Sequence, residues 1–147
     1  RYFMATVKGL DKLHAKFNAI ANINVAKAVK KATTFVQGQA KELAPFDTGR
    51  LKGSIRMKVD VKDSNVIGKV YTNLEYAPYL EFGTGIRGDG SYPYSPDGLN
   101  LTYKKDWKGM KARPYMYPAL KGAENYVKTM INEEIKLSIK SICKGRK

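Results

Sequence analysis

The hydrophobic period of the chain changes between Pro45 and Ser54. Upstream, small and apolar residues recur at spacings of three and four, which is the period of one helical face. Downstream, apolar and polar residues alternate, which is the period of a half-buried strand. The helical stripe is Ala26, Val29, Ala32 or Thr33, Val36, Ala40 and Leu43, and the alternating apolar residues are Ile55, Met57, Val59 and Val61. Because a proline disfavours helical geometry in the residue before it, we expect the helix to stop at about residue 44.

Two further amphipathic helices are predicted, a short one near the start and a long one at the end. Asn22–Asn24 interrupts the helical pattern after the first, and Pro118 suits the first position of the last. The apolar stripes are Leu10, Leu13, Phe17 and Ile20 in the first helix, and Leu120, Ala123, Val127, Ile131, Ile135, Ile139 and Ile142 in the last.

The middle of the chain predicts extended structure and a long loop. Residues 63–65 favour a turn into a second strand over 66–72, which makes an antiparallel hairpin. Residues 76–85, YAPYLEFGTG, predict a third extended segment, which Pro78 restricts to an edge strand or a bend. Residues 83–113 are rich in glycine without a sustained period. We expect an irregular loop there, with a short strand at 99–103 and with 86–111 mobile in the free subunit.

These patterns predict a single α+β domain over residues 4–147, with Arg1–Phe3 set aside as a cloning remnant because Met4 is a natural start. The expected architecture has N-terminal helices, a small antiparallel sheet with a hairpin and a long irregular loop, and a C-terminal amphipathic helix packed on the sheet. Hydrophobic residues make up 43% of the chain, which is enough to build a core.

Charge and cysteine content limit the classes of function. The formal net charge is +14, and its excess of Lys and Arg lies in the first and last thirds, a distribution that attracts polyanions. Cys143 and His14 are the sole cysteine and histidine, so we expect no zinc site, no other metal or cofactor, and a reducing compartment. No apolar run reaches the roughly 20 residues needed to cross a bilayer. We therefore expect synthesis in the cytoplasm and no membrane partner.

Asp47-Thr48-Gly49 is the tripeptide that carries the catalytic aspartate of aspartic proteases, which need two carboxylates sharing one proton. Here a predicted helix and then Pro45 precede it, and Arg50 follows, whose cation favours ionisation of both carboxylates. We interpret Asp47 as the cap of a turn over 48–52 and Gly49 as a position that only glycine adopts freely. We also expect a charge-assisted contact between Asp47 and Arg50 or Arg113.

Residues 83–88, Gly-Thr-Gly-Ile-Arg-Gly, match the G-x-G-x-x-G pattern of dinucleotide-binding sites. That pattern requires a helix beginning at its glycines, which present backbone N–H groups to the pyrophosphate. The following residues 89–93, Asp-Gly-Ser-Tyr-Pro, favour a flexible loop instead. We therefore expect no nucleotide site and no catalytic residue.

Eight of the ten tyrosines lie between residues 71 and 117, interleaved with cations around Trp107. Aromatics beside cations stack on nucleic-acid bases, but Tyr, Trp and Arg are also enriched at protein interfaces, which we favour. The candidate interface residues are Tyr79, Tyr92, Tyr94, Tyr103, Trp107 and Tyr115, and the candidate DNA-proximal residues are Lys104, Lys105, Lys108 and Lys111.

Three segments, taken in order, resemble signatures of the tail-completion, or head-tail joining, proteins of long-tailed bacteriophages and prophages. They are KELAPFDTGRLKGSI at 41–55, YAPYLEFGTG at 76–85 and RPYMYPAL at 113–120. The loop 86–111 departs from the family by its length and its content of Tyr and Lys. The residues that carry the resemblance are Pro45, Asp47, Thr48, Gly49, Leu51, Tyr76, Glu81, Phe82, Gly83, Thr84, Arg113, Pro114 and Pro118.

The resemblance implies a non-enzymatic virion subunit that assembles as a ring of about six copies around the DNA path, between the head neck and the tail tube. Its partners would be other copies of itself and the neck and tail-tube proteins, with non-specific DNA contact. The residues alone leave two other functions open. One is a basic nucleic-acid-binding module, whose affinity would fall steeply with salt. The other is a small toxin-like ribonuclease that uses Lys, Arg and Tyr in place of His.

Overall fold

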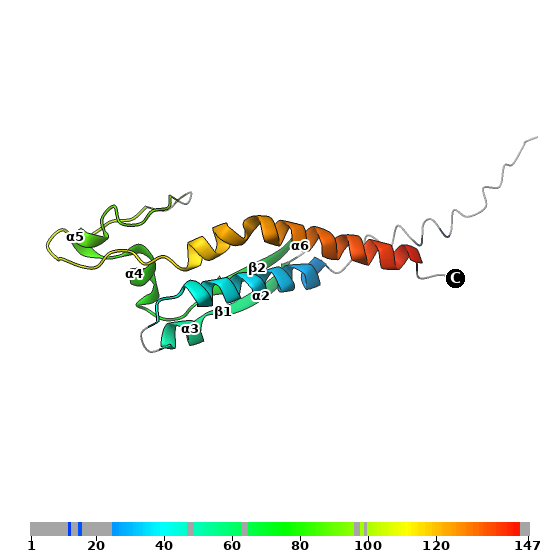
Figure 1. Ribbon diagram of the computed structural model, residues 1–147, viewed down its shortest axis with the longest axis horizontal. Coiled ribbons are helices and arrows are strands. Elements are labelled where there is room, and N and C mark those ends of the chain that lie inside the picture. Colours follow the sequence, from blue (N-terminus) through cyan, green and yellow to red (C-terminus); the bar gives the residue numbers. More distant parts are fainter. Residues whose placement is uncertain are drawn as a thin grey trace, which may run out of the picture.

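The computed structural model describes residues 12, 15, 25–46, 49–62, 65–95, 98 and 100–144. The elements are α2 (Val25–Leu43), α3 (Arg50–Ser54), β1 (Arg56–Lys62), β2 (Asn65–Tyr71), α4 (Ala77–Phe82), α5 (Gly85–Gly88) and α6 (Met116–Lys144). The two long helices and the hairpin run along the long axis, and α4 and α5 lie at one end (Figure 1). The predicted α+β class is confirmed. The helix expected over 10–20 lies outside the described residues except for Lys12 and Ala15, which are both helical and exposed.

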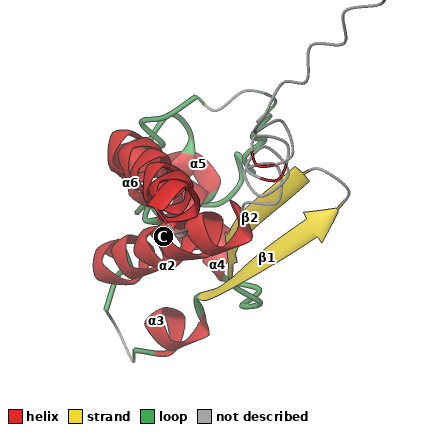
Figure 2. Cartoon of the chain, turned by 90° about the vertical axis from the view of Figure 1, so that its right-hand side faces the viewer, coloured by secondary structure: helices red, strands yellow, loops and turns green. Residues whose placement is uncertain are grey.

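α2 lies at the centre of the fold, because α6 and both strands of the hairpin pack on it (Figure 2). Its buried residues are Ala28, Ala32, Thr33, Val36 and Ala40. The distance between packed elements depends on the side chains at the contact, so this row of small residues allows close approach. The helix ends at Leu43, which confirms the prediction made from Pro45.

The hairpin presents one face to α2 and the other to solvent. Val59 pairs with Gly68 in the antiparallel register, and this pair faces α2. On the opposite face, the Asp60 carboxylate forms ion pairs with Lys58 and Lys69, with N–O distances of 2.7 and 3.2 Å. Both predicted strands are confirmed, and the alternation predicted for the first holds over residues 56–59 but not at Asp60 and Val61.

The connection between α2 and β1 turns at Gly49, whose φ of 73° lies in the left-handed region that glycine enters without steric cost. The single turn of α3 follows and brings Leu51 and Ile55 into the core. Asp47 and Thr48 lie outside the described residues, as do residues 63 and 64 of the hairpin turn. The cap by Asp47 and its contact with an arginine therefore stay predictions.

Residues 76–85, predicted to be extended, are helical instead over α4. Pro78 does not oppose the helix because it lies in the first turn, where its missing N–H leaves no hydrogen bond unmade. The helix places Ala77 and Glu81, four residues apart, on the same buried face. A proline excludes a central strand but equally suits a helix start, and the burial of this face selects the helix.

The segment from 83 to 113 has a hydrogen-bonded framework where an irregular loop was predicted. Thr84 and Met110 form an antiparallel bridge, with N–O distances of 2.9 Å in both directions. A Cβ on Gly109 would clash with the Thr84 carbonyl group, so the two halves of the segment approach this closely because the position lacks a side chain. The short strand predicted at 99–103 is wrong over the described residues 100–103, which are not in a strand. The mobility of 86–111 stays a prediction.

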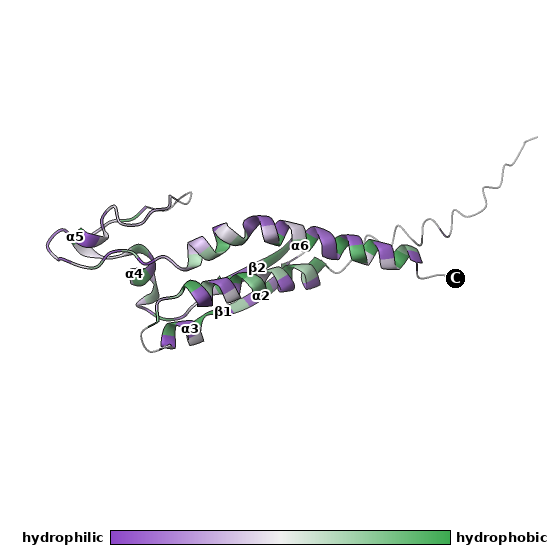
Figure 3. Cartoon of the chain, viewed as in Figure 1, coloured by the Kyte–Doolittle hydropathy of each residue, from purple (hydrophilic) through white to green (hydrophobic). Residues whose placement is uncertain are grey.

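α6 confirms the predicted long C-terminal helix, in which hydrophobic and hydrophilic residues alternate along the length (Figure 3). It begins at Met116, so Pro118 takes its third position rather than its first. The helix packs on α2, and near its far end Glu134 forms ion pairs with Lys27 and Lys31 of α2, at 3.2 and 2.6 Å. The core, at the start of α6, comprises Ala40, Ala44, Leu51, Ile55, Ala77, Tyr115 and Ala119.

We expect Gly68→Ala to lower the free energy of unfolding by about 1–3 kcal/mol, the usual cost of overpacking. A Cβ at this position would overlap Oγ1 of Thr33 and press on Cγ1 of Val29 at 3.2 Å. Urea unfolding followed by circular dichroism measures the change. Gly38→Ala in α2 is the control: its methyl group meets nothing within 4 Å, and this change should stabilise the helix by about 0.5–1 kcal/mol. Equal effects of the two substitutions would contradict the close packing of β2 on α2.

Candidate functional site

The buried carboxylate of Glu81 joins α4 to the start of α6. Oε2 accepts hydrogen bonds from the backbone N–H groups of Tyr115 and Met116, at 2.7 and 3.0 Å, and Oε1 accepts one from Tyr117 at 3.1 Å. The first N–H groups of a helix have no partner within the helix and carry partial positive charge, so a carboxylate is stabilised there. Because Glu81 is only 5% exposed, little water can replace it. The contact sets the position of α4, and of the segment that follows it, relative to α6.

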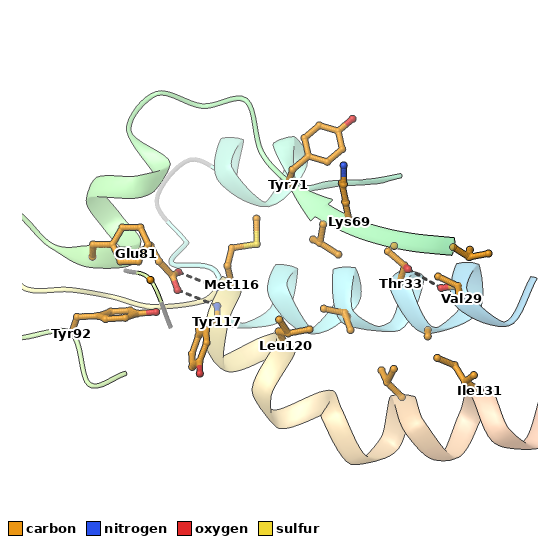
Figure 4. A pocket seen from close by; sticks show the side chains of 18 residues that line it. Val29, Thr33, Lys69, Tyr71, Glu81, Tyr92, Met116, Tyr117, Leu120 and Ile131 are labelled. Atoms are coloured by element: carbon orange, nitrogen blue, oxygen red, sulfur yellow. Dashed lines mark hydrogen bonds between the residues drawn. The ribbon is translucent and has the colours of Figure 1, made fainter. Parts of the chain in front are cut away.

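A row of four aromatic rings continues from this contact, and we call it the aromatic row: Phe82, Tyr92, Tyr94 and Tyr117. Successive ring centroids lie 5.1, 5.5 and 4.9 Å apart, in tilted or edge-to-face geometries that are favourable between aromatic rings. The Tyr92 hydroxyl is buried without a hydrogen-bond partner among the described residues, and its ring lies beside Glu81 and Tyr117 (Figure 4). Burial, and then the negative charge of Glu81, raises the pKa of Tyr92 to about 12.

Beside the aromatic row, an apolar groove of about 900 Å³ runs between β2 and α6, with α2 as its floor. We call it the β2–α6 groove. Glu81 and Tyr92 lie at one end of it, and Val29 and Ile131 lie at the other (Figure 4). The groove exists because β2 and α6 both pack on α2 but do not meet each other above it.

A second hollow, of about 700 Å³, lies on the projecting end of the molecule, which we define as α4, α5 and residues 100–113. Tyr79 and Trp107 line it and are 59% and 55% exposed, and Lys104 borders it. We call it the aromatic hollow. Monomer surfaces rarely expose large contiguous apolar patches, and aromatic residues are enriched at interfaces, so this arrangement suits contact with another macromolecule.

The six candidate interface residues fall into three environments. They line the aromatic hollow (Tyr79, Tyr103, Trp107), belong to the aromatic row (Tyr92, Tyr94) or lie in the core (Tyr115). The structure corrects the interface prediction for Tyr115, which is 1% exposed and cannot contact a partner through its side chain. Tyr103 is engaged within the chain, since its hydroxyl donates to the Phe82 carbonyl oxygen at 2.9 Å. Tyr79 and Trp107 are therefore the candidates most available to a partner.

The four candidate DNA-proximal lysines, Lys104, Lys105, Lys108 and Lys111, are all exposed on the projecting end. Lys111 also lines a smaller hollow of about 470 Å³ together with Arg87 and Arg113. The projecting end thus combines exposed aromatic side chains with cations.

The G-x-G-x-x-G segment forms the single turn of α5 from its second glycine, which corrects the expectation of a loop there. The turn does not make a nucleotide site, because its N–H groups are used within the chain. Ile86 and Arg87 donate to the carbonyl oxygens of Trp107 and Lys108, and Gly88 donates to that of Thr84, at 2.9 to 3.0 Å. These N–H groups are therefore not offered to a phosphate.

No metal site forms within the part of the chain that the structure describes, where no group of three or more His, Cys, Asp and Glu residues could hold an ion. Asp47 and His14 lie outside that part. No helix over the described residues combines the length and the apolar character needed to cross a membrane.

The anchoring role of Glu81 could not be identified from the sequence, where the residue was recognisable only as part of the segment 76–85. Its partners are backbone N–H groups 34 to 36 positions away. Every residue except proline carries such a group, so the sequence does not mark which ones a carboxylate will meet. The spacing of four between Ala77 and Glu81 is a partial signal, because it places the acid on an apolar helical face.

A protein family described as "Bacteriophage HK97-gp10, putative tail-component" matches residues 5–83, which is more than half of the chain. The chain belongs to this tail-component family. The match spans α2, the hairpin and α4, and it stops at Gly83, where the rest of the projecting end begins. Comparisons with curated proteins and with solved structures gave no match. Membership in the HK97-gp10-like family indicates a structural component of the phage virion that interacts with other virion proteins.

We expect Glu81→Ala to lower the free energy of unfolding by about 3 kcal/mol, because three N–H groups at the start of α6 lose their acceptor in a place with little access to water. Glu81→Gln should cost less, since its amide oxygen can still accept from two of the three groups. Urea unfolding at neutral pH measures both. Glu133→Ala, at an exposed position of α6, is the control and should leave stability unchanged. A Glu81→Ala variant as stable as this control would show that the carboxylate does not anchor α6.

Stability should fall at alkaline pH in a manner that depends on Tyr92. Its pKa is about 12 in the fold against 10.0 ordinarily. Below pH 10 both states hold the proton and the stabilising contribution is complete, and it is lost as pH rises toward 12. Tyr92→Phe should reduce this loss but not abolish it, because burial raises the pKa of Tyr115 to about 12 as well. It should cost little stability at neutral pH, since no described residue lies within hydrogen-bonding geometry of the hydroxyl that it removes. Urea midpoints measured up to about pH 11.5 test this, with Tyr79→Phe as the exposed control that should retain the wild-type loss.

Proposed function

We propose that this phage tail component completes the end of the tail and joins it to the neck of the head, assembling as a ring around the DNA path. Family membership supports the tail assignment. The finer role is supported by one observation, the projecting end, where Tyr79 and Trp107 are exposed on a framework that Glu81 ties to α6. A protein whose function is assembly needs such a surface rather than a catalytic centre.

In this proposal, neighbouring subunits associate through the aromatic hollow and the segment 76–85. Interface energy is concentrated in a few buried aromatic or arginine side chains, and truncating one of them commonly costs 2 kcal/mol or more, or about 30-fold in affinity. Tyr79 and Trp107 have the chemistry and the exposure for this role. The Thr84–Met110 bridge holds the two halves of the projecting end together before a partner arrives, which lowers the cost of ordering on binding.

The resemblance to tail-completion proteins implies a ring of about six subunits, and a closed ring of one chain requires a heterologous interface that closes on itself. It would sit at the head-tail junction of the virion after synthesis in the bacterial cytoplasm, with the neck and tail-tube proteins as partners. The exposed Lys104, Lys105, Lys108 and Lys111 would approach the DNA that passes through the ring, and a net charge of +14 suits a non-specific contact of this kind.

Electron microscopy of the purified protein mixed with its tail tubes should show rings that cap the tube ends. The double variant Tyr79→Ala, Trp107→Ala should reduce capping at least about tenfold through loss of interface contacts. Leu137→Ala, an exposed hydrophobic position on α6 far along the chain from the projecting end, is the control and should cap like the wild type. A wild-type protein that stays monomeric and binds neither neck nor tail components would refute the joining role.

A further inference from the structure

The β2–α6 groove exposes apolar side chains that a folded subunit would normally cover. Leu120 lines it and is 57% exposed. Val61 pairs with Val66, a groove residue at the end of the hairpin, and is 61% exposed although it belongs to the α2-facing side of the strand. Apolar side chains that are not covered contribute neither the hydrophobic free energy of burial nor the dispersion energy of close contacts. The groove therefore needs an occupant.

The position at which α2 begins points to that occupant. α2 begins at Val25, and Val29, one turn later, already lines the groove. α2 therefore begins at the end of the groove where Val29 and Ile131 lie (Figure 4). The asparagines of 22–24 disfavour continuation of the helix, and about four extended residues reach roughly 13 Å, which is enough for the chain to reverse.

The chemistry of the N-terminal segment complements the groove. Leu10, Leu13, Phe17 and Ile20 fall on one side of a helix with 3.6 residues per turn. The two residues of this segment that the structure describes, Lys12 and Ala15, fall on the opposite side, and both are helical and exposed.

Length and family membership agree with this occupant. Twelve helical residues, 9–20, span about 18 Å, and the six residues 66–71 of β2 beside the groove span about 20 Å. The family match begins at residue 5, so the segment belongs to the family unit and is not an unrelated extension.

We propose that residues 9–20 dock as an amphipathic helix in the β2–α6 groove of their own chain, with Phe17 and Leu13 between β2 and α6. The docked helix covers the apolar walls of the groove, and Lys12 and Ala15 face solvent. This docking does not depend on the head-tail joining role. It is tested on the purified subunit without tails, so either idea can fail without the other.

Cysteine pairs in the full chain test the proposal, in a Cys143→Ser background that removes the native thiol. Phe17→Cys is combined in turn with Val66→Cys, Val127→Cys and Ile131→Cys, three groove positions on β2 and α6. Mild oxidation should link at least one of these pairs within the chain, as peptide mass spectrometry and an unchanged mass on a denaturing gel would show. The matched control replaces Phe17→Cys with Lys12→Cys and should link at least about fivefold less, since disulfides require close and oriented Cβ atoms.

Three outcomes overturn the proposal. Links found only in dimers would assign the groove to a second copy of the chain. Equal yields for Phe17→Cys and the Lys12→Cys control would show that no face of the segment is selected. The absence of any link from Phe17→Cys would show that the segment does not enter the groove.

A second measurement guards against misfolding of the cysteine variants. Phe17→Asp should raise binding of the dye ANS, which reports exposed apolar surface, about threefold while the far-ultraviolet circular dichroism is retained. Lys12→Asp, on the opposite face, should leave dye binding at the wild-type level. Equal dye binding by the two variants would also overturn the proposal.

Discussion

The fold and its exposed surface both depend on the contact between the Glu81 carboxylate and the first N–H groups of α6. One residue of that contact, Tyr115, donates its backbone N–H to Glu81 and fills the core with its ring. The same interaction therefore fixes the start of α6, the orientation of α4 relative to it, and the position of Tyr115, the largest fully buried side chain. The projecting end follows α4 directly, so its aromatic hollow is held in place by a buried charge that a helix N-terminus stabilises.

The long elements could be predicted because their hydrophobic periods run over many residues. α2, the hairpin and α6 all form where the spacing of apolar residues predicts them. The short elements α4 and α5 were predicted wrongly as extended or irregular chain. An element of four to six residues contains too few repeats to reveal a period. Its conformation is selected by contacts with distant parts of the chain, as the three bonds of Glu81 show.

The candidate site could be predicted in composition but not in arrangement. The clustering of tyrosines and lysines between 71 and 117 indicated an interaction surface, and the exposed Tyr79 and Trp107 agree with that hypothesis. Tyr115, two positions from Arg113, is a core residue instead, and Tyr92 and Tyr94 are half-buried and pack against each other. Nothing in the local sequence separates these tyrosines, because the same side chain suits a core, a stack or an interface. The β2–α6 groove was equally invisible, since its three walls come from separate parts of the chain.

The sequence by itself determined the α+β class, the end of α2 before Pro45, the hairpin and the final helix, and the ordered segments that resemble phage tail-completion proteins. These features rest on local spacing and on residue types with strong backbone preferences. Only the tertiary structure decided that residues 77–82 are helical, that Glu81 holds the start of α6, and which aromatic side chains reach the surface. Those outcomes depend on which distant backbone groups and apolar faces meet, and a backbone N–H group has the same identity at almost every position of a sequence.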